Sequence, residues 1–227
     1  MQSSPDAPAQ SVLEQAGLAA EAAADWRGNE LDLSGDYRRD AAAGSHFWLT
    51  GAKLLARLPP KPRRGAAQAA AAGLITQASR RARDRFLELH AEALYRTLTK
   101  DYRSFVRVEQ LAFDAAAVPG LTPTREQVAM ESGLPQKDKE GVEIDQGMFL
   151  SRVLAHPKAG AHLCHAMLLP TAAATERLDE FRARGTLDFG AVTVDRRGKA
   201  AIVTLRNPRF LNAEDETTLD ATETAVD

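Results

Sequence analysis

The stretch FGAVTVDRRGKAAIVTLRNP, residues 189–208, decides the fold of the C-terminal part of the chain. Apolar side chains recur at Val192 and Val194, and again from Ile202 to Leu205, on either side of a turn that contains Gly198. Short apolar runs of this kind around a residue that accepts positive φ are typical of a β-hairpin. The stretch therefore predicts two antiparallel strands, the second of which ends at Asn207-Pro208.

The residues that follow the hairpin read as the start of a helix. In AEDETTLDATETAVD, residues 213–227, Asp and Glu fill the first turn, where carboxylates complement the helix dipole. A hairpin and one helix bury too little surface to fold alone. We therefore expect this segment to pack on the preceding residues, or on further chain beyond Asp227.

The chain before the hairpin shows the spacing of helices. We expect a disordered tail at 1–10 and a helical domain at 11–186, because apolar residues recur every three to four positions and Pro or Gly closes each run. The expected helices are Ser11–Trp26, Ser45–Leu58, one helix of about thirty residues within 84–120, a short helix that Thr122 caps, and three segments between 143 and 185.

The composition is that of a soluble globular protein. Of the 227 residues 44% are hydrophobic and 26% charged, and the net charge of -2 provides no global field for nucleic acid or an anionic membrane. The single cysteine excludes an internal disulfide. The N-terminus lacks the pattern of a signal peptide, and the alanine-rich run 65–76 is too short to span a bilayer. We expect a cytoplasmic protein with no nucleic-acid or membrane partner.

One cluster has the residue types of a metal site or a nucleophile. His156, His162, Cys164 and His165 fall within ten residues, and imidazole and thiolate are zinc ligands. On one helix, however, Cys164 points away from the pair His162 and His165, and adjacent positions cannot meet as a Cys-His dyad. Structural roles for these side chains are favoured, and no metal is expected.

The hairpin together with NPRFLNAEDETTLD, residues 207–220, resembles the opening of the crotonase, or enoyl-CoA hydratase/isomerase, superfamily. Those domains begin with an alternating strand, an Asn-Pro-type turn and an Asn-Ala pair that leads into the first helix. The matching residues here are Ile202 to Leu205, Asn207-Pro208 and Asn212-Ala213. The resemblance implies an α-helical N-terminal domain followed, at 187–227, by the beginning of an α/β crotonase (ClpP/crotonase-like) domain.

The helical domain in front of this opening narrows the resemblance. With EIDQGMFLSRVLAHPKAGAHL (143–163) and LDEFRARGTLDFGAVTVDRRG (178–198), the layout looks like the cofactor-independent dioxygenases of glycopeptide-antibiotic biosynthesis that act on an arylacetyl-CoA. The resemblance implies a CoA thioester and O2 as substrates, no cofactor, and a homo-oligomer, either a trimer or a dimer of trimers. It also implies an oxyanion hole of two backbone N–H groups, which we expect after Asp227 because no position here matches them.

Site residues carry over only where the motif matches. The resemblance places Arg209, Phe210, Leu211, Asn212 and Ala213 along the CoA moiety, with Arg209 as a phosphate contact. Asn212 and Ala213 could instead only shape the turn. For the hydroxyls of the aryl ring we choose Glu176 over Glu180, since a carboxylate can accept two hydroxyl hydrogen bonds.

Two other functions remain open from the sequence. The first is an enoyl-CoA hydratase or isomerase with an added helical domain. The second is a noncatalytic helical interaction module with a β-appendage. Oxygen consumption separates the dioxygenase from the hydratase, and the chain that follows Asp227 separates either enzyme from the module.

Overall fold

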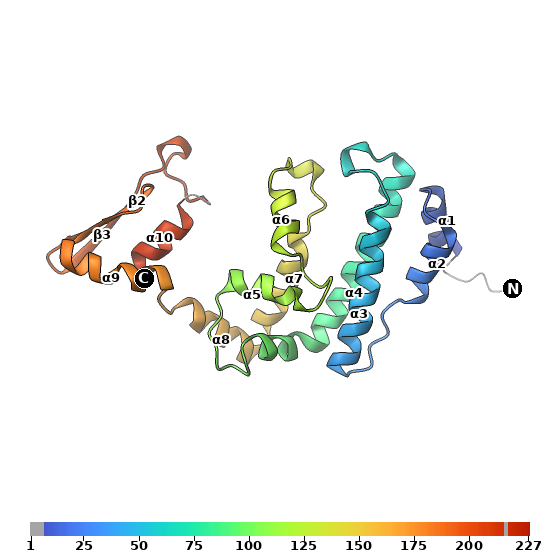
Figure 1. The fold of residues 1–227 in the computed structure, drawn as a ribbon, viewed down its shortest axis with the longest axis horizontal. Coiled ribbons are helices and arrows are strands. Elements are labelled where there is room, and N and C mark those ends of the chain that lie inside the picture. The colour runs from blue at the N-terminus through green and yellow to red at the C-terminus, as the bar shows by residue number, and fades with distance from the viewer. Residues whose placement is uncertain (1–6, 216–217) are drawn as a thin grey trace. The chain divides into compact units, whose positions relative to one another are not determined.

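The chain consists of two compact units, which are described separately. The computed structural model describes residues 7–215 and 218–227 (Figure 1). The first unit extends to Cys164 and the second runs from His165 to Asp227. The predicted domain boundary at 186/187 differs from this division, because the helix before the strands packs against them. Of the predicted tail at 1–10, residues 7–10 are helical, and the rest lie outside the described residues.

The regular elements of the first unit are all helices within its described residues. Its α-helices are α1 (Ala7–Gln15), α2 (Ala20–Gly28), α3 (Tyr37–Leu55), α4 (Ala66–Leu98), α5 (Val108–Asp114), α6 (Arg125–Ser132), α7 (Glu143–Ala155) and most of α8 (Pro157–Met167), with short 3-10 turns η1 (Lys61–Arg63), η2 (Ala115–Ala117) and η3 (Gln136–Asp138). The helices α3 and α4 lie side by side, and α7 packs on α4 (Figure 1). No helix in the described part of the chain has the length and apolar character needed to cross a bilayer.

The structure corrects the predictions for two helical segments. The helix expected at Ser11–Trp26 is two helices, because Gly17 takes a φ of +83° that an α-helix cannot accommodate. The short helix expected after Thr122 is capped by Thr124, whose side chain accepts a hydrogen bond from the N–H of Gln127. The Gln127 side chain accepts from the N–H of Thr124 in return, so the sequence signal for this helix is a capping box.

The long helix was predicted with the right length at the wrong place. The helix α4 has 33 residues, begins in the alanine-rich segment at Ala66 and ends at Leu98, so the expectation of a helix within 84–120 is wrong beyond that point. Lys100, Asp101 and Tyr102 all take positive φ, between 51° and 63°. Left-handed residues cannot continue a right-handed helix, and the chain turns back here before α5 begins.

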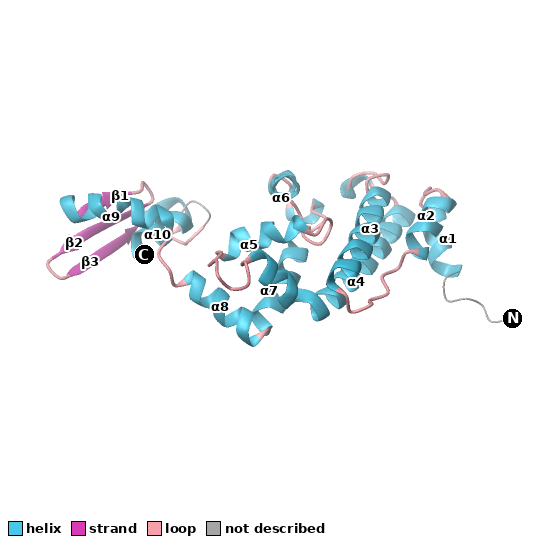
Figure 2. Ribbon diagram, turned by 60° about the horizontal axis from the view of Figure 1, so that its bottom comes forward, coloured by secondary structure: helices cyan, strands magenta, loops and turns pink. Residues whose placement is uncertain are grey.

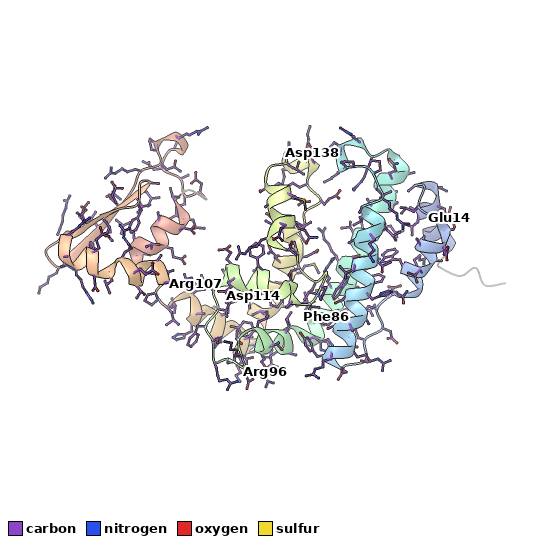
Figure 3. The ribbon with its side chains drawn as sticks, in the orientation of Figure 1. Glu14, Phe86, Arg96, Arg107, Asp114 and Asp138 are labelled. Atoms are coloured by element: carbon purple, nitrogen blue, oxygen red, sulfur yellow. The ribbon has the colours of Figure 1, made fainter. Side chains whose placement is uncertain are left out.

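Aromatic side chains form the centre of the first unit. Trp26 of α2 stacks on Phe47 of α3, with ring centroids 5.1 Å apart. Phe86 of α4, labelled in Figure 3, has no exposed surface. Its ring and that of Trp48 are arranged edge to face, with centroids 5.5 Å apart. Such pairs contribute about 0.5–1.5 kcal/mol each beyond the area they bury. This packing fixes α3 against α4, and with them the side chains that both helices carry.

The second unit contains a small antiparallel sheet. Its elements are α9 (Ala172–Arg184), β1 (Thr186–Asp188), β2 (Val192–Arg197), β3 (Ala200–Leu205), the 3-10 turn η4 (Pro208–Phe210) and α10 (Leu219–Val226). The strand order is β1-β2-β3 (Figure 2). The predicted hairpin is confirmed as β2 and β3, with Gly198 at φ +65° in the turn. The additional strand β1 was not predicted, because three residues are too few to show a period of two.

Both helices of the second unit pack on one face of this sheet. Leu187 of β1 pairs with Val194 of β2, and both side chains are buried. These two residues and Ala201 of β3 line the same hollow as side chains from α9 and α10. The helix α10 begins at Leu219, six residues later than the carboxylate-rich start that the sequence suggested.

Two glycines on neighbouring helices predict opposite effects of the same substitution. A Cβ at Gly160 in α8 would lie 2.5 Å from the carbonyl oxygen of Leu154, a backbone atom that cannot move away. We expect Gly160→Ala to lower the free energy of unfolding by about 1–3 kcal/mol. Gly147 in α7 has open space around its Cβ position, so Gly147→Ala should raise stability by up to about 1 kcal/mol. Urea unfolding of both variants measures the two signs, and equal effects would contradict the packing at the α7–α8 corner.

Candidate functional site

The candidate site is the loop from Arg206 to Asp215 between β3 and α10, called here the Asn207 loop. Asn207 lies at its centre and is 8% exposed. Its amide nitrogen donates to the carbonyl of Ala213 at 3.0 Å and to the carboxylate of Asp215 at 2.9 Å. Its backbone N–H donates to the side-chain oxygen of Asn212 at 2.8 Å, and its carbonyl accepts from the N–H of Asn212 at 2.7 Å. One buried asparagine thus ties both ends of the loop together.

The middle of the Asn207 loop takes an uncommon backbone conformation. Leu211 and Asn212 have φ of 57° and 58°. Asparagine tolerates the left-handed region, whereas for leucine this conformation costs energy that the surrounding structure must offset. Leu211 is also 95% exposed, so its side chain gains nothing from burial within the described residues. Strained, exposed apolar residues of this kind are found at ligand-binding loops more often than in ordinary turns.

The structure places the predicted CoA contacts on one short surface segment. Arg209, Leu211, Asn212 and Ala213 are exposed, and the side chain of Phe210 lies outside the described part of the chain. Asn212 does shape the turn, since its side chain caps the N–H of Asn207. Asn212 can shape the turn and also contact CoA. The hydrogen bond from the Asn207 N–H to its side chain holds the exposed backbone around Leu211 in place.

The two acidic candidates on α9 occupy different surroundings. Glu180 forms ion pairs with Arg177 at 3.0 Å and with Arg184 at 2.7 Å, so its charge is already used within the helix. Glu176 is exposed and is not part of the lining of the hollow between α9 and the sheet. Among the described residues Glu176 forms no hydrogen bond or ion pair with the Asn207 loop, and its role toward an aryl ring stays a prediction.

The second unit has a hollow of about 300 Å³ between α9, the sheet and α10, called here the sheet pocket. Most of its lining is apolar, with Leu178, Phe181, Leu187 and Val194 among its walls. Asp227 lies at its rim and accepts a hydrogen bond from the N–H of Thr171 at 2.9 Å. The Asn207 loop leads into the first turn of α10 and this pocket adjoins the last turn, so about 10 Å of helix separates them.

Two of the histidines around α8, His162 and His156, form hydrogen bonds within the first unit, whereas Cys164 is exposed. The Nδ1 atom of His162 lies 2.8 Å from the hydroxyl of Tyr95, and its Nε2 atom lies 3.0 Å from the carbonyl oxygen of Tyr102. His156 accepts a hydrogen bond from the N–H of Ala159. Among the described residues no three His, Cys, Asp or Glu side chains are grouped as metal ligands. These contacts give His162 a structural role at a partly buried position.

Sequence reasoning missed a buried carboxylate in the first unit. Asp40 is 1% exposed and lies on the stripe of α3 that also carries Phe47 and Leu54. It accepts hydrogen bonds from the N–H and hydroxyl of Ser34, from the N–H of Gly35 at 3.0 Å, and lies 2.8 Å from Nε2 of His90. A charged residue within an apolar helical stripe was the signal that could have revealed it.

The electrostatics of Asp40 follow from these partners. Burial by itself raises the pKa of the Asp40 carboxyl, but the hydrogen bonds from Ser34, His90 and Gly35 outweigh burial and hold the pKa well below its ordinary value. Asp40 is therefore a carboxylate at neutral pH. It fixes the segment before α3 to α4, and it has the character of a structural group.

The comparisons with known proteins support the resemblance. No family model matches the chain. The chain is 45% identical over 176 residues to a protein of Amycolatopsis orientalis, (3,5-dihydroxyphenyl)acetyl-CoA 1,2-dioxygenase. The match covers 77% of this chain and 41% of that relative, so the chain spans about two fifths of the length of the relative it matches. The resemblance predicted from the sequence is thus confirmed: over most of its length, the chain is similar to a (3,5-dihydroxyphenyl)acetyl-CoA 1,2-dioxygenase.

Proposed function

We propose that this chain is part of a dioxygenase that converts 3,5-dihydroxyphenylacetyl-CoA and O2 to 3,5-dihydroxyphenylglyoxylate and free CoA. The observation that carries the proposal is the 45% identity, over 77% of the chain, to a protein named for this reaction. The small antiparallel sheet and the helices before it are compatible with a helical region followed by the opening of a crotonase domain. The oxyanion-hole donors would then belong to chain beyond Asp227.

The proposed chemistry uses the thioester as its own activating group. Loss of a benzylic proton gives an enolate, whose oxygen two backbone N–H groups stabilise. The carbanion reacts with O2, and the resulting peroxide attacks the thioester carbonyl and displaces the thiolate. O–O cleavage with loss of the second benzylic proton then gives the arylglyoxylate. Both oxygen atoms of O2 enter the acid, and the two benzylic hydrogens leave as protons, one of which the thiolate takes up. No metal or organic cofactor is part of the proposal.

The Asn207 loop is the part of the chain to which we assign CoA. Arg209, Phe210, Leu211, Asn212 and Ala213 would run along the CoA moiety, and Glu176 would hold the ring hydroxyls. The hydrogen bonds of Asn207 support the first assignment, because they hold an exposed backbone segment in one conformation in advance of binding. We further propose a cytoplasmic homo-oligomer, a trimer or a dimer of trimers, without nucleic-acid or membrane partners.

An oxygen electrode tests the reaction directly. The purified protein that contains this chain is mixed with 3,5-dihydroxyphenylacetyl-CoA, and O2 uptake is compared with free thiol and with arylglyoxylate found by mass spectrometry. One O2 consumed per thiol and per acid supports the proposal, and unchanged rates after exhaustive chelation support the metal-free form. Hydration of an enoyl-CoA without O2 uptake would overturn it in favour of a hydratase, and inactivity with both substrates in favour of an interaction module.

The assignment of Arg209 to a CoA phosphate makes a separate prediction. Arg209→Ala should raise the KM for the CoA thioester about tenfold and leave kcat nearly unchanged, because a charge-assisted contact to a remote phosphate is lost equally in ground and transition states. With the matching pantetheine thioester, which has no nucleotide phosphates, the same variant should behave like the wild type. Arg197→Ala, at an exposed arginine of β2, is the matched control. An Arg209 effect that persists with pantetheine would contradict a phosphate contact.

A further inference from the structure

The first unit contains a hollow that the proposed function does not use. It has a volume of about 310 Å³ and is called here the arginine pocket. Side chains of α3 and α4, the segment 119–124 and the start of α7 enclose it; its charged members are Arg80, Arg83, Glu140 and Asp145, and its apolar members include Trp48, Leu49, Leu55 and Pro119. This volume is at the lower end of the range for small-molecule sites, about 300–1,000 Å³.

Arg83 is the most enclosed charge in the arginine pocket. Its side chain is 13% exposed, and its Nε and Nη2 atoms both donate to the carbonyl of Gly120, at 3.0 and 2.8 Å. Gly120 takes a φ of +79°, a conformation that aims this carbonyl at the guanidinium and that side-chain-bearing residues rarely adopt. The remaining nitrogen, Nη1, lies 3.3 Å from Asp145. The fold thus holds one face of a guanidinium rigidly at the pocket.

The carboxylate of Asp145 lies near two arginines and forms a close ion pair with neither. Arg80 lies 3.4 Å from one of its oxygens and Arg83 lies 3.3 Å from the other, both longer than a close charge-assisted bond of about 2.7–2.9 Å. Burial raises the pKa of Asp145, against the effect of Arg83 and Arg80. Burial also lowers the pKa of Arg83, and Asp145 only partly opposes this. Two guanidinium groups therefore share one carboxylate in a poorly solvated place.

The other acidic groups near the pocket are already engaged. Glu140 pairs with Arg64, at 2.6 Å. Glu131, behind the pocket wall, accepts hydrogen bonds from the N–H groups of Glu140, Gly141 and Val142. Arg80 donates to the carbonyl of Gly141 through Nη2 and contacts Asp145 through Nε. Its third nitrogen, Nη1, has no partner among the described residues. The donors that face the pocket thus exceed the acceptors available to them.

Two buried polar atoms of the lining also lack partners. Thr122 is 4% exposed, and its hydroxyl has no hydrogen-bond partner within the described residues. Trp48 is 1% exposed, and its indole N–H is unpaired in the same sense. Leaving a buried polar group unpaired costs about 1–3 kcal/mol. Both atoms have almost no accessible surface, so a ligand in the pocket would not reach them.

We propose that the arginine pocket binds a small organic carboxylate with an apolar body. The carboxylate accepts a hydrogen bond from Arg80, and it balances the second guanidinium. The apolar part lies against Trp48, Leu49 and Pro119. A single negative charge suits the surplus of one cation over Asp145, and the apolar wall gives inorganic anions no advantage. The site stands apart from the proposed reaction, since no residue assigned to CoA or the aryl ring belongs to it.

Calorimetric titration of the full chain with benzoylformate tests the site. We expect saturable binding with one equivalent, weakened about tenfold or more in Arg80→Gln, because a hydrogen bond from a charged donor is lost. The matched control is Arg152→Gln, since Arg152 also pairs with a single aspartate, Asp84, at 2.7 Å, but does not line the pocket.

Three probes distinguish the parts of the proposal. The neutral ester methyl benzoylformate should bind at least tenfold more weakly than the acid, and inorganic phosphate should not compete. Binding of the acid that survives Arg80→Gln unchanged would overturn the site, as would equal binding of acid and ester. Phosphate binding without benzoylformate binding would overturn the apolar part. Unfolding curves of each variant verify that the chain tested is folded.

Discussion

Asp40→Ala should lower the free energy of unfolding of the first unit by roughly 3–5 kcal/mol, because it removes the acceptor of a buried, charged network. Ser34 would lose the acceptor for its N–H and its hydroxyl, Gly35 would lose the acceptor for its N–H, and the ring of His90 would face an apolar void. Urea unfolding measured by tryptophan fluorescence reports on this unit, since both tryptophans, Trp26 and Trp48, are buried in it.

The control and the pH dependence make this expectation specific. Asp36→Asn, at the exposed N-cap of the same helix, keeps an oxygen for the N–H of Arg39 and should change stability by about 0.5 kcal/mol or less. The pKa of Asp40 is lower in the folded than in the unfolded state, so its contribution is present above the unfolded value of about 3.9 and is lost as pH falls toward the folded value. The gap between wild type and Asp40→Ala should therefore narrow below about pH 4. A gap that is constant from pH 7 to pH 3 would contradict a charged network.

The parts of the fold that sequence predicted are those in which one local signal acts alone. The hairpin of β2 and β3 follows from apolar runs around a glycine turn, and the helical character of residues 20–184 follows from spacing and from Pro and Gly stops. The break after Leu98 carries no such signal, because Lys100, Asp101 and Tyr102 are ordinary helix-compatible residues. It depends on tertiary packing, which holds Tyr102 against Tyr95 with ring centroids 5.6 Å apart.

The same distinction explains which site residues were found. The residues from Arg209 to Ala213 are contiguous, so a motif could name them. Asn207 was recognised only as part of a turn, since nothing local shows that its amide is buried and reaches Asp215. The arginine pocket is further from any sequence signal, because its charges come from positions 80, 83, 140 and 145. Asp145 lies in the first turn of α7.

Asn207→Leu should open the Asn207 loop while leaving the sheet intact, since leucine keeps nearly the same volume and removes both side-chain donors. The carbonyl of Ala213 and the carboxylate of Asp215 would lose their buried partner, at a cost of roughly 2–4 kcal/mol in local stability. Hydrogen exchange resolves the effect by residue. The N–H of Asn212, now bonded to the carbonyl of Asn207, should exchange about 30-fold to 1,000-fold faster, whereas amides between β2 and β3 should keep their rates.

The matched control separates the buried amide from the turn itself. Asn212→Asp retains an oxygen for the N–H of Asn207 and a residue type that tolerates positive φ, so protection of the loop should be close to that of the wild type. If the loop binds CoA, Asn207→Leu should also raise the KM for the thioester without any change at Arg209, because binding must then order the segment that the amide now holds in advance. Faster exchange with an unchanged KM would leave Asn207 as a purely structural residue. An unchanged exchange rate would show that the strain at Leu211 is held by something other than this amide.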